Sequence, residues 1–211
     1  LVEAFRVACA ADGWTLDYST TGRIHIHKGS YHFEVYAYTS AILGIVGCTG
    51  YTSGQTPPNQ PGASGILQMH VITSSTANYQ IISTGSNVIC LLYRLYGSAI
   101  NSCAFGVINE KIGSWSGGQF VLGGAGYYST NCPIWSTVSS GVLMMDGAWA
   151  PNASFGSLCG LFGTTFNLRS RMPNTYNAGI LRLPITVYLR NLTTSTLYHP
   201  IGYAPNIYQV A

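Results

Sequence analysis

Two short alternating segments, separated by two residues, constrain the fold of this chain more than any other feature. Polar and apolar side chains alternate in residues 23–28 (Arg-Ile-His-Ile-His-Lys) and again in residues 31–36 (Tyr-His-Phe-Glu-Val-Tyr). A period of two residues is typical of strands that bury one face. The connection Gly29-Ser30 begins with Gly, which favours a type II′ turn. The sequence therefore predicts a β-hairpin with Ile24 and Ile26 on one face.

Further strands are expected at short intervals along the chain. Pro184 lies within the last of them and places that strand at a sheet edge or at a bulge. The predicted strands are apolar segments bounded by Gly, Ser, Asn or Pro, at residues 66–72, 79–83, 88–96, 103–109, 119–122, 142–146 and 180–189.

Only the N-terminus has clear helical spacing, with apolar residues at Val2, Phe5, Ala8 and Cys9. Gly13 is a natural end for this helix, and we expect the adjacent Trp14 to anchor it against the sheet. The chain is therefore predicted to be a single, mainly β domain over residues 1–211. Its expected architecture is a β-sandwich or barrel-like fold with one short N-terminal α-helix.

Two segments are expected to extend from this domain. Residues 49–65 are rich in Gly, Pro, Ser and Thr and form a loop longer than ordinary connections. We expect this loop to be a flexible excursion or an arm that binds a partner. Residues 198–211 are expected to be a C-terminal extension that could reach a neighbouring subunit.

Charged residues are scarce, and this excludes several classes of protein. They make up 7% of the 211 residues, nine Lys and Arg and six Asp and Glu, for a formal net charge of +3. Soluble domains usually carry about 25%. A disordered chain, a coiled coil and a basic nucleic-acid reader all need more charge than this. A surface with so few charges favours association with other proteins.

The sequence predicts neither a transmembrane helix nor a secretory signal. Its purest apolar run, residues 41–46, is far shorter than the roughly 20 residues that span a bilayer. Because the chain begins at Leu1 rather than Met, we expect some processing or trimming, which could include removal of a leader.

We expect no enzymatic activity and no cofactor. The sequence has no GxSxG, P-loop, HExxH or GxGxxG motif. A hydrolase with two catalytic carboxylates would have to draw them from only six acidic residues.

The cysteines are widely spaced and form no CxxC pair. We expect buried free thiols, with some disulfides or, less favoured, a metal site as the alternatives. The six are Cys9, Cys48, Cys90, Cys103, Cys132 and Cys159.

Three histidines lie on the predicted hairpin. His25 and His27 share one strand face, and His32 lies on the paired strand. Three imidazoles on one face could bind Zn²⁺ or Ni²⁺. A two-residue turn does not by itself place His32 beside His27, so the sequence favours an ordinary polar face over a metal site.

Aromatic residues and arginines are the candidates for interfaces. Some of the aromatic residues are expected to pack in the core, and the others could serve protein contacts or sugar binding: Tyr127, Tyr128, Trp115, Trp135 and Trp149. The shortage of acids to fix sugar hydroxyls favours protein contacts. Arg169 and Arg171 could pair with an acidic neighbouring subunit, or they could lie on a solvated loop.

Three segments together resemble a family of tailed-bacteriophage virion structural proteins. The first is residues 5–28, a helix that ends in Asp-Gly-Trp-Thr and leads to a strand. The second is residues 105–120, similar to a Phe-Gly…Glu-Lys-x-Gly-x-Trp-Ser-Gly-Gly signature centred on Trp115. The third is residues 183–188, followed by a Pro-Ile-Gly-x-x-Pro turn at residues 200–205. In the signature, Gly113 and Gly117-Gly118 permit positive φ, and Trp115 can hold the turn onto the fold.

The resemblance implies a virion component and no catalytic residues. We expect a ring or collar subunit at the neck, tail or baseplate, assembled in the host cytoplasm with other virion proteins and with copies of itself. We expect no direct nucleic-acid readout. The alternative is a carbohydrate- or receptor-binding β module at a phage tip.

Overall fold

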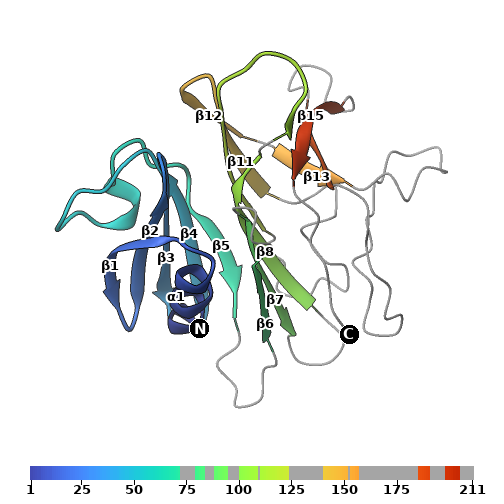
Figure 1. The fold of residues 1–211 in the computed structure, drawn as a ribbon. Coiled ribbons are helices and arrows are strands. Elements are labelled where there is room, and N and C mark those ends of the chain that lie inside the picture. The colour runs from blue at the N-terminus through green and yellow to red at the C-terminus, as the bar shows by residue number, and fades with distance from the viewer. Residues whose placement is uncertain are drawn as a thin grey trace.

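The structure is a computed structural model that describes residues 1–71, 79–83, 88–94, 100–108, 110–123, 140–151, 153–156, 185–190 and 198–204. Strands dominate the described residues, and the one α-helix among them lies at the N-terminus (Figure 1). This confirms the prediction of a mainly β fold with an N-terminal helix. The strands form three antiparallel sheets and no closed barrel.

The first sheet, sheet A, follows the chain order of its strands. It contains β1 (Thr15–Thr20), β2 (Arg23–Lys28), β3 (Tyr31–Thr39), β4 (Ile42–Cys48) and β5 (Leu67–His70). The strands of sheet B lie in the order β12 (Ala148–Pro151), β11 (Ser140–Met145), β10 (Gly117–Gly123), β8 (Ile100–Val107), β7 (Val88–Arg94) and β6 (Tyr79–Ser83). Sheet C contains β13 (Ala153–Gly156), β14 (Ile185–Arg190), β15 (Tyr198–Ala204) and β9 (Glu110–Lys111).

The helix α1 spans Val2–Ala11 and ends as the sequence predicts. Gly13 follows it with a φ of 79°, a conformation that favours glycine. Trp14 then packs edge-on against Phe33, with ring centroids 5.5 Å apart, and against Phe105 at 6.3 Å. The tryptophan therefore anchors the end of the helix to both sheet A and sheet B.

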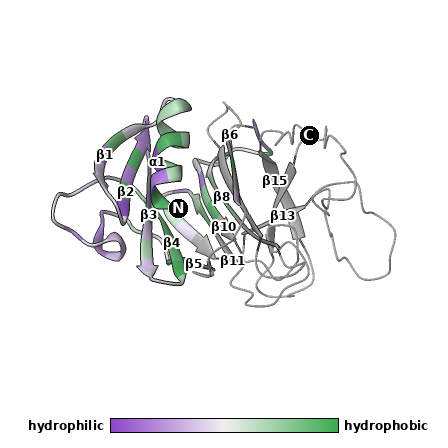
Figure 2. Cartoon of the chain, turned by 90° about the horizontal axis from the view of Figure 1, so that it is seen from below, coloured by the Kyte–Doolittle hydropathy of each residue, from purple (hydrophilic) through white to green (hydrophobic). Residues whose placement is uncertain are grey.

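The main core lies between α1 and the facing sides of sheets A and B. The helix contacts β1 to β3 of sheet A and β6 of sheet B, while β8 and β10 approach the β3 to β5 side of sheet A. Phe105 on β8 joins the three elements, with ring centroids 5.9 Å from Phe5 and 5.1 Å from Phe33. Hydrophobic residues of α1, β4, β8 and β10 gather where these elements meet (Figure 2).

The β2–β3 hairpin has the predicted register. Lys28 pairs with Tyr31 across the two-residue turn, and Ile24 and Ile26 are fully buried in the main core. Gly29 has a φ of 60°, whereas Ser30 does not have a positive φ. A type I′ turn needs positive φ at both residues, so the turn matches the predicted type II′.

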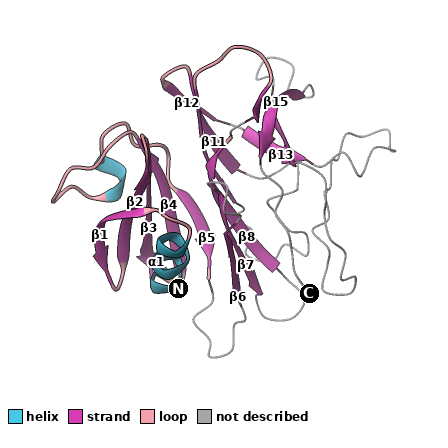
Figure 3. Cartoon of the chain, viewed as in Figure 1, coloured by secondary structure: helices cyan, strands magenta, loops and turns pink. Residues whose placement is uncertain are grey.

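Residues 49–66 cover the other face of sheet A, away from sheet B (Figure 3). A short 3-10 helix, Pro57–Asn59, forms within this loop. The side chain of Gln60 is buried and holds the loop together: Oε1 accepts from the Thr52 amide at 2.8 Å, and Nε2 donates to the carbonyls of Thr52 and Gln55. The loop is therefore packed on its own sheet rather than being a flexible excursion, and its expected role as an arm that binds a partner stays a prediction.

The expected C-terminal extension is partly wrong. Residues 198–204 form β15, which pairs with β14 on one side and β9 on the other. Pro200-Ile201-Gly202 accordingly lies in a strand rather than in a turn, and a register shift opposite Pro200 accommodates the proline. Pro184 and residues 205–211 lie outside the described residues.

Cys9 and Cys48 are buried free thiols, as the sequence predicts, and Cys103 is buried as well. The side chain of Cys90, together with Cys132 and Cys159, lies outside the described part of the chain. Among the described residues, no helix has both the length and the apolar character needed to cross a bilayer.

Candidate functional site

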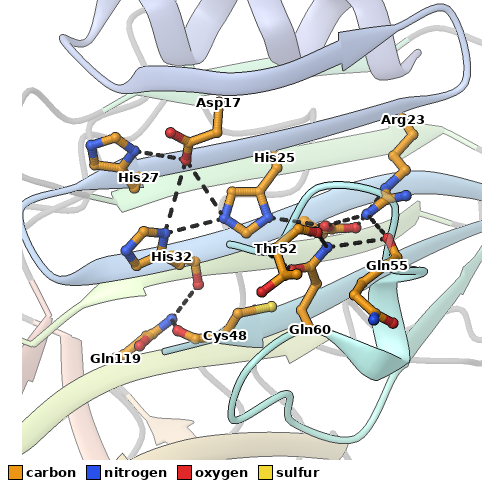
Figure 4. Close-up of polar contacts among 11 residues, drawn as sticks. Asp17, Arg23, His25, His27, His32, Cys48, Thr52, Gln55, Gln60 and Gln119 are labelled. Carbon is orange, nitrogen blue, oxygen red and sulfur yellow. Dashed lines mark hydrogen bonds and ion pairs between the residues drawn. The ribbon is translucent and has the colours of Figure 1, made fainter. Parts of the chain in front are cut away.

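The outer face of sheet A carries a dense cluster of polar side chains. It contains Asp17, Arg23, His25, His27, His32 and Glu34, which come from the adjacent strands β1, β2 and β3 (Figure 4). Because side chains alternate along a strand, burying Ile24 and Ile26 on the inner face turns His25 and His27 to the outer face. The loop at 49–66 closes over part of this face, and the ring of Tyr51 lies 4.6 Å from that of His25.

At one end of the cluster, Arg23 and His25 both bind the carboxylate of Glu34. Arg23 donates from Nε and Nη2 to the two carboxylate oxygens, at 2.8 and 2.6 Å, and its Nη2 also reaches the carbonyl of Gln55 in the loop. The Nδ1 atom of His25 lies 3.0 Å from Oε1 of Glu34, and both side chains are fully buried. Since a carboxylate only accepts, Nδ1 of His25 carries the proton and its Nε2 points the other way.

At the other end, the three histidines and Asp17 converge. His25 Nε2 lies 3.1 Å from His32 Nδ1, and His27 Nδ1 lies 2.8 Å from Asp17 Oδ2. His27 and His32 are direct partners in the hairpin register and stack with centroids 5.1 Å apart. The sequence-based argument against their proximity is therefore wrong, because the two-residue turn fixes a register in which they lie opposite each other.

Asp17, Arg23 and Glu34 are the members of the cluster that the sequence did not predict, and Asp17 reaches the cluster through a bulge. Leu16 pairs with Ile26 and Tyr18 with His25, so Asp17 is an extra residue at a β-bulge in β1. A bulge bends the strand and redirects a side chain, and here it directs the carboxylate toward the histidines. Residues 15–20 (Thr-Leu-Asp-Tyr-Ser-Thr) alternate like those of the neighbouring strands, but β1 is not among the strands predicted from the sequence.

The surroundings of Glu34 favour its charged form, whereas those of His32 favour its neutral form. Burial acts to raise the pKa of Glu34, but hydrogen bonds from His25 and Arg23 outweigh it, so the net pKa lies below its ordinary value. The pKa of His32 is lowered, first by burial and then by the neighbouring His25 and His27, with Asp17 opposing. Glu34 is therefore ionised at neutral pH, and His32 is mainly neutral.

This arrangement can bind a cation or hold strands together, but it disfavours a cysteine nucleophile. Cys48 is the register partner of His32, and burial, aided by the charge of Glu34, raises the pKa of its thiol to about 12. A reactive cysteine needs a lowered pKa, so Cys48 stays in the thiol form. Neutral imidazoles and a carboxylate are, in contrast, the ligands that divalent transition metals prefer.

The signature segment at 105–120 forms a second polar structure. Lys111 Nζ donates to the carbonyl of Gly117 at 2.6 Å and lies 4.7 Å from the ring centroid of Trp115. The indole Nε1 of Trp115 donates to the carbonyl of Ile112 at 3.1 Å. Gly113, Gly117 and Gly118 all have positive φ, as expected. Trp115 thus stabilises a turn of its own chain.

The other sequence-based interface candidates cannot be placed. Tyr127, Tyr128, Trp135, Arg169 and Arg171 all lie outside the described residues.

Trp149, by contrast, is described. It lies on β12 and donates from Nε1 to the carbonyl of Gly62 at 2.7 Å, so it joins sheet B to the loop that covers sheet A.

No known protein-family model matches the chain, and no curated protein sequence matches it either. A functional conclusion must therefore rest on the geometry and on the resemblance of the three segments.

Proposed function

We propose that this protein is a structural component of a tailed-phage virion, a ring or collar subunit at the neck, tail or baseplate that acts by subunit assembly. The observation that carries the proposal is the role of the signature segment. Its strand β8 belongs to sheet B, β9 pairs with sheet C, and Gln119 on β10 reaches sheet A. A motif at the junction of three sheets supports a family defined by shared architecture rather than by shared chemistry.

The polar groups of this segment are hydrogen-bonded within the chain. The amide and hydroxyl of Ser116 both bind Asp146 Oδ1, and the amide of Ile108 donates to the carbonyl of Gly118. A Cβ atom at Gly117 would lie 2.5 Å from the carbonyl oxygen of Met144, so the turn packs tightly against β11. Such satisfied groups suit a structural joint better than a site that must bind and release a substrate.

The edge of sheet B supplies a surface for assembly. Strand β6 (Tyr-Gln-Ile-Ile-Ser) has no partner on its outer side among the described strands, and it contains no charge and no proline. Monomeric proteins usually place charged residues or proline on an edge strand, because the free N–H and C=O groups of such a strand pair readily with another chain. Tyr79 on this edge is 51% exposed.

The first test is the mass of the purified protein by light scattering, together with its copy number in intact particles. We expect a defined oligomer and several copies per particle. A monodisperse monomer that binds no other virion protein contradicts the proposal. Specific glycan binding by such a monomer would instead favour the carbohydrate- or receptor-binding module.

A variant pair tests the role of the β6 edge. Tyr79→Lys places a charge on this edge and should lower the apparent mass of the assembly. Tyr38→Lys is the matched control, because Tyr38 is 44% exposed on β3, a strand inside sheet A. An equal effect of the two substitutions would argue against assembly through β6.

A further inference from the structure

We propose that Asp17, His27 and His32, together with His25, form a binding site for a divalent transition-metal ion. This inference goes beyond a role in assembly, because it concerns the outer face of sheet A and not the signature segment or the β6 edge. The ligand atoms that Asp17, His27 and His32 can offer all lie within 4.8 Å of one another.

The distances between the ligand atoms fit a single ion. The Oδ2 atom of Asp17 lies 2.8 Å from His27 Nδ1, 3.7 Å from His25 Nε2 and 3.9 Å from His32 Nδ1. The distance between His25 Nε2 and His32 Nδ1 is 3.1 Å. Ligands arranged tetrahedrally around Zn²⁺, with bonds of about 2.0–2.1 Å, lie about 3.4 Å from one another. The observed distances lie on both sides of this value, so small side-chain rotations suffice to enclose an ion.

The residues around the cluster orient its ligands. The carboxylate of Glu34 accepts a hydrogen bond from the Nδ1–H group of His25 and two more from Arg23. Metal-binding histidines usually donate their second ring nitrogen to a carboxylate in this way, which leaves the first nitrogen free for the metal. The bulge at Asp17 contributes equally, because it brings the only carboxylate of the four ligands to the cluster.

The cluster is also open enough for an ion to enter. The side chains of Asp17, His27 and His32 are 22%, 27% and 17% exposed, whereas that of His25 is fully buried. The ion would thus enter from the β1 edge and meet His25 last. Three imidazoles and one carboxylate match Zn²⁺, Co²⁺ or Ni²⁺ rather than Mg²⁺ or Ca²⁺, which prefer oxygen ligands.

The direct test is titration of the EDTA-treated, dialysed protein with ZnCl₂ by calorimetry. We expect one ion per chain and a rise in Tm with Zn²⁺ concentration, because an ion that binds only the folded state stabilises it. Asp17→Asn and His27→Ala should each weaken binding at least tenfold. His199→Gln is the matched control, since it removes a histidine from β15 of sheet C and should leave binding unchanged.

A spectroscopic measurement separates this site from the cysteines. Co²⁺ bound by nitrogen and oxygen ligands in a tetrahedral site gives strong visible absorption without a thiolate charge-transfer band. Absence of Zn²⁺ binding up to millimolar concentration would overturn the proposal. It is also overturned if a thiolate band appears, or if Asp17→Asn and His27→Ala, folded by circular dichroism in EDTA, bind Zn²⁺ as well as the unsubstituted protein.

Discussion

The indole ring of Trp149 lies directly over Gly47, so closely that a Cβ atom at this glycine would overlap the ring. Gly47 is the penultimate residue of β4 in sheet A, and Trp149 comes from β12, an edge strand of sheet B. The missing side chain at Gly47 thus lets β12 reach the loop that covers sheet A.

Gly47→Ala should lower the free energy of unfolding by about 1–3 kcal/mol, because the added methyl group must displace the indole ring. The measurement is urea unfolding followed by tryptophan fluorescence. Gly65→Ala is the matched control, since nothing lies within 4 Å of a Cβ atom there. Equal stability of the two variants would contradict the described packing.

Gln119→Met should destabilise the fold by about 1–3 kcal/mol. The buried amide of Gln119 donates to the carbonyl of His32 and, at 2.9 Å, to that of Cys48, so its loss removes two hydrogen bonds that join β10 to sheet A. Thermal unfolding checks this value, with the exposed Gln55→Met as the control. A change below about 0.5 kcal/mol would show that this link between sheets A and B contributes little.

Tyr36→Phe should leave stability unchanged or raise it by about 1 kcal/mol. The hydroxyl of Tyr36 is buried without a hydrogen-bond partner among the described residues, so its removal relieves an unsatisfied polar group. Gly44→Ala should have the opposite effect, because its Cβ atom would lie 2.6 Å from the ring of Tyr36. Chemical denaturation of both variants tests the pair, and a large loss in Tyr36→Phe would reveal a partner for the hydroxyl.

Stability should fall as the pH rises above about 9. Burial, aided by Asp12, raises the pKa of Cys9 to about 12, and the pKa of Cys48 is raised to about 12 as well. Between the unfolded and folded pKa values the unfolded chain has lost thiol protons that the native state keeps, so each thiol lowers stability by about 1.4 kcal/mol per pH unit. Below pH 9 both the folded and the unfolded chain keep their thiol protons, so the stabilisation is complete there.

Denaturant unfolding at pH 8 and at pH 10.5 measures this slope, and Cys9→Ala should reduce it. In native protein at pH 8, alkylation of Cys9 and Cys48 should be slow, and it should become complete in denaturant. Rapid alkylation of the native protein would show that these thiols are accessible.

The elements with a clear local pattern could be predicted from the sequence. Strict alternation around Gly29-Ser30 specified the hairpin and its buried isoleucines, and the spacing of Val2, Phe5 and Cys9 specified the helix. Each of these depends on residues that are near one another in the chain.

Features set by distant contacts could not be predicted in this way. The bulge that brings Asp17 to the histidines depends on how β1 pairs with β2, and no local motif marks it. The loop at 49–66 has the composition of a flexible segment, yet it is packed against sheet A. The carbonyl of Gln55 accepts hydrogen bonds from the side chain of Gln60 within the loop and from Arg23 on β2. The three histidines of the candidate site could therefore be predicted from the sequence, but the carboxylate of Asp17 could not.

The bulge at Asp17 has a consequence for how copies of this chain meet. It interrupts the regular pairing of β1, an edge strand of sheet A, and places a charged side chain there, which discourages another strand from adding to that edge. The described residues of β6 in sheet B contain no bulge, no charge and no proline, although helix α1 contacts this strand. Strand addition between copies is thus expected at the β6 edge rather than at the β1 edge.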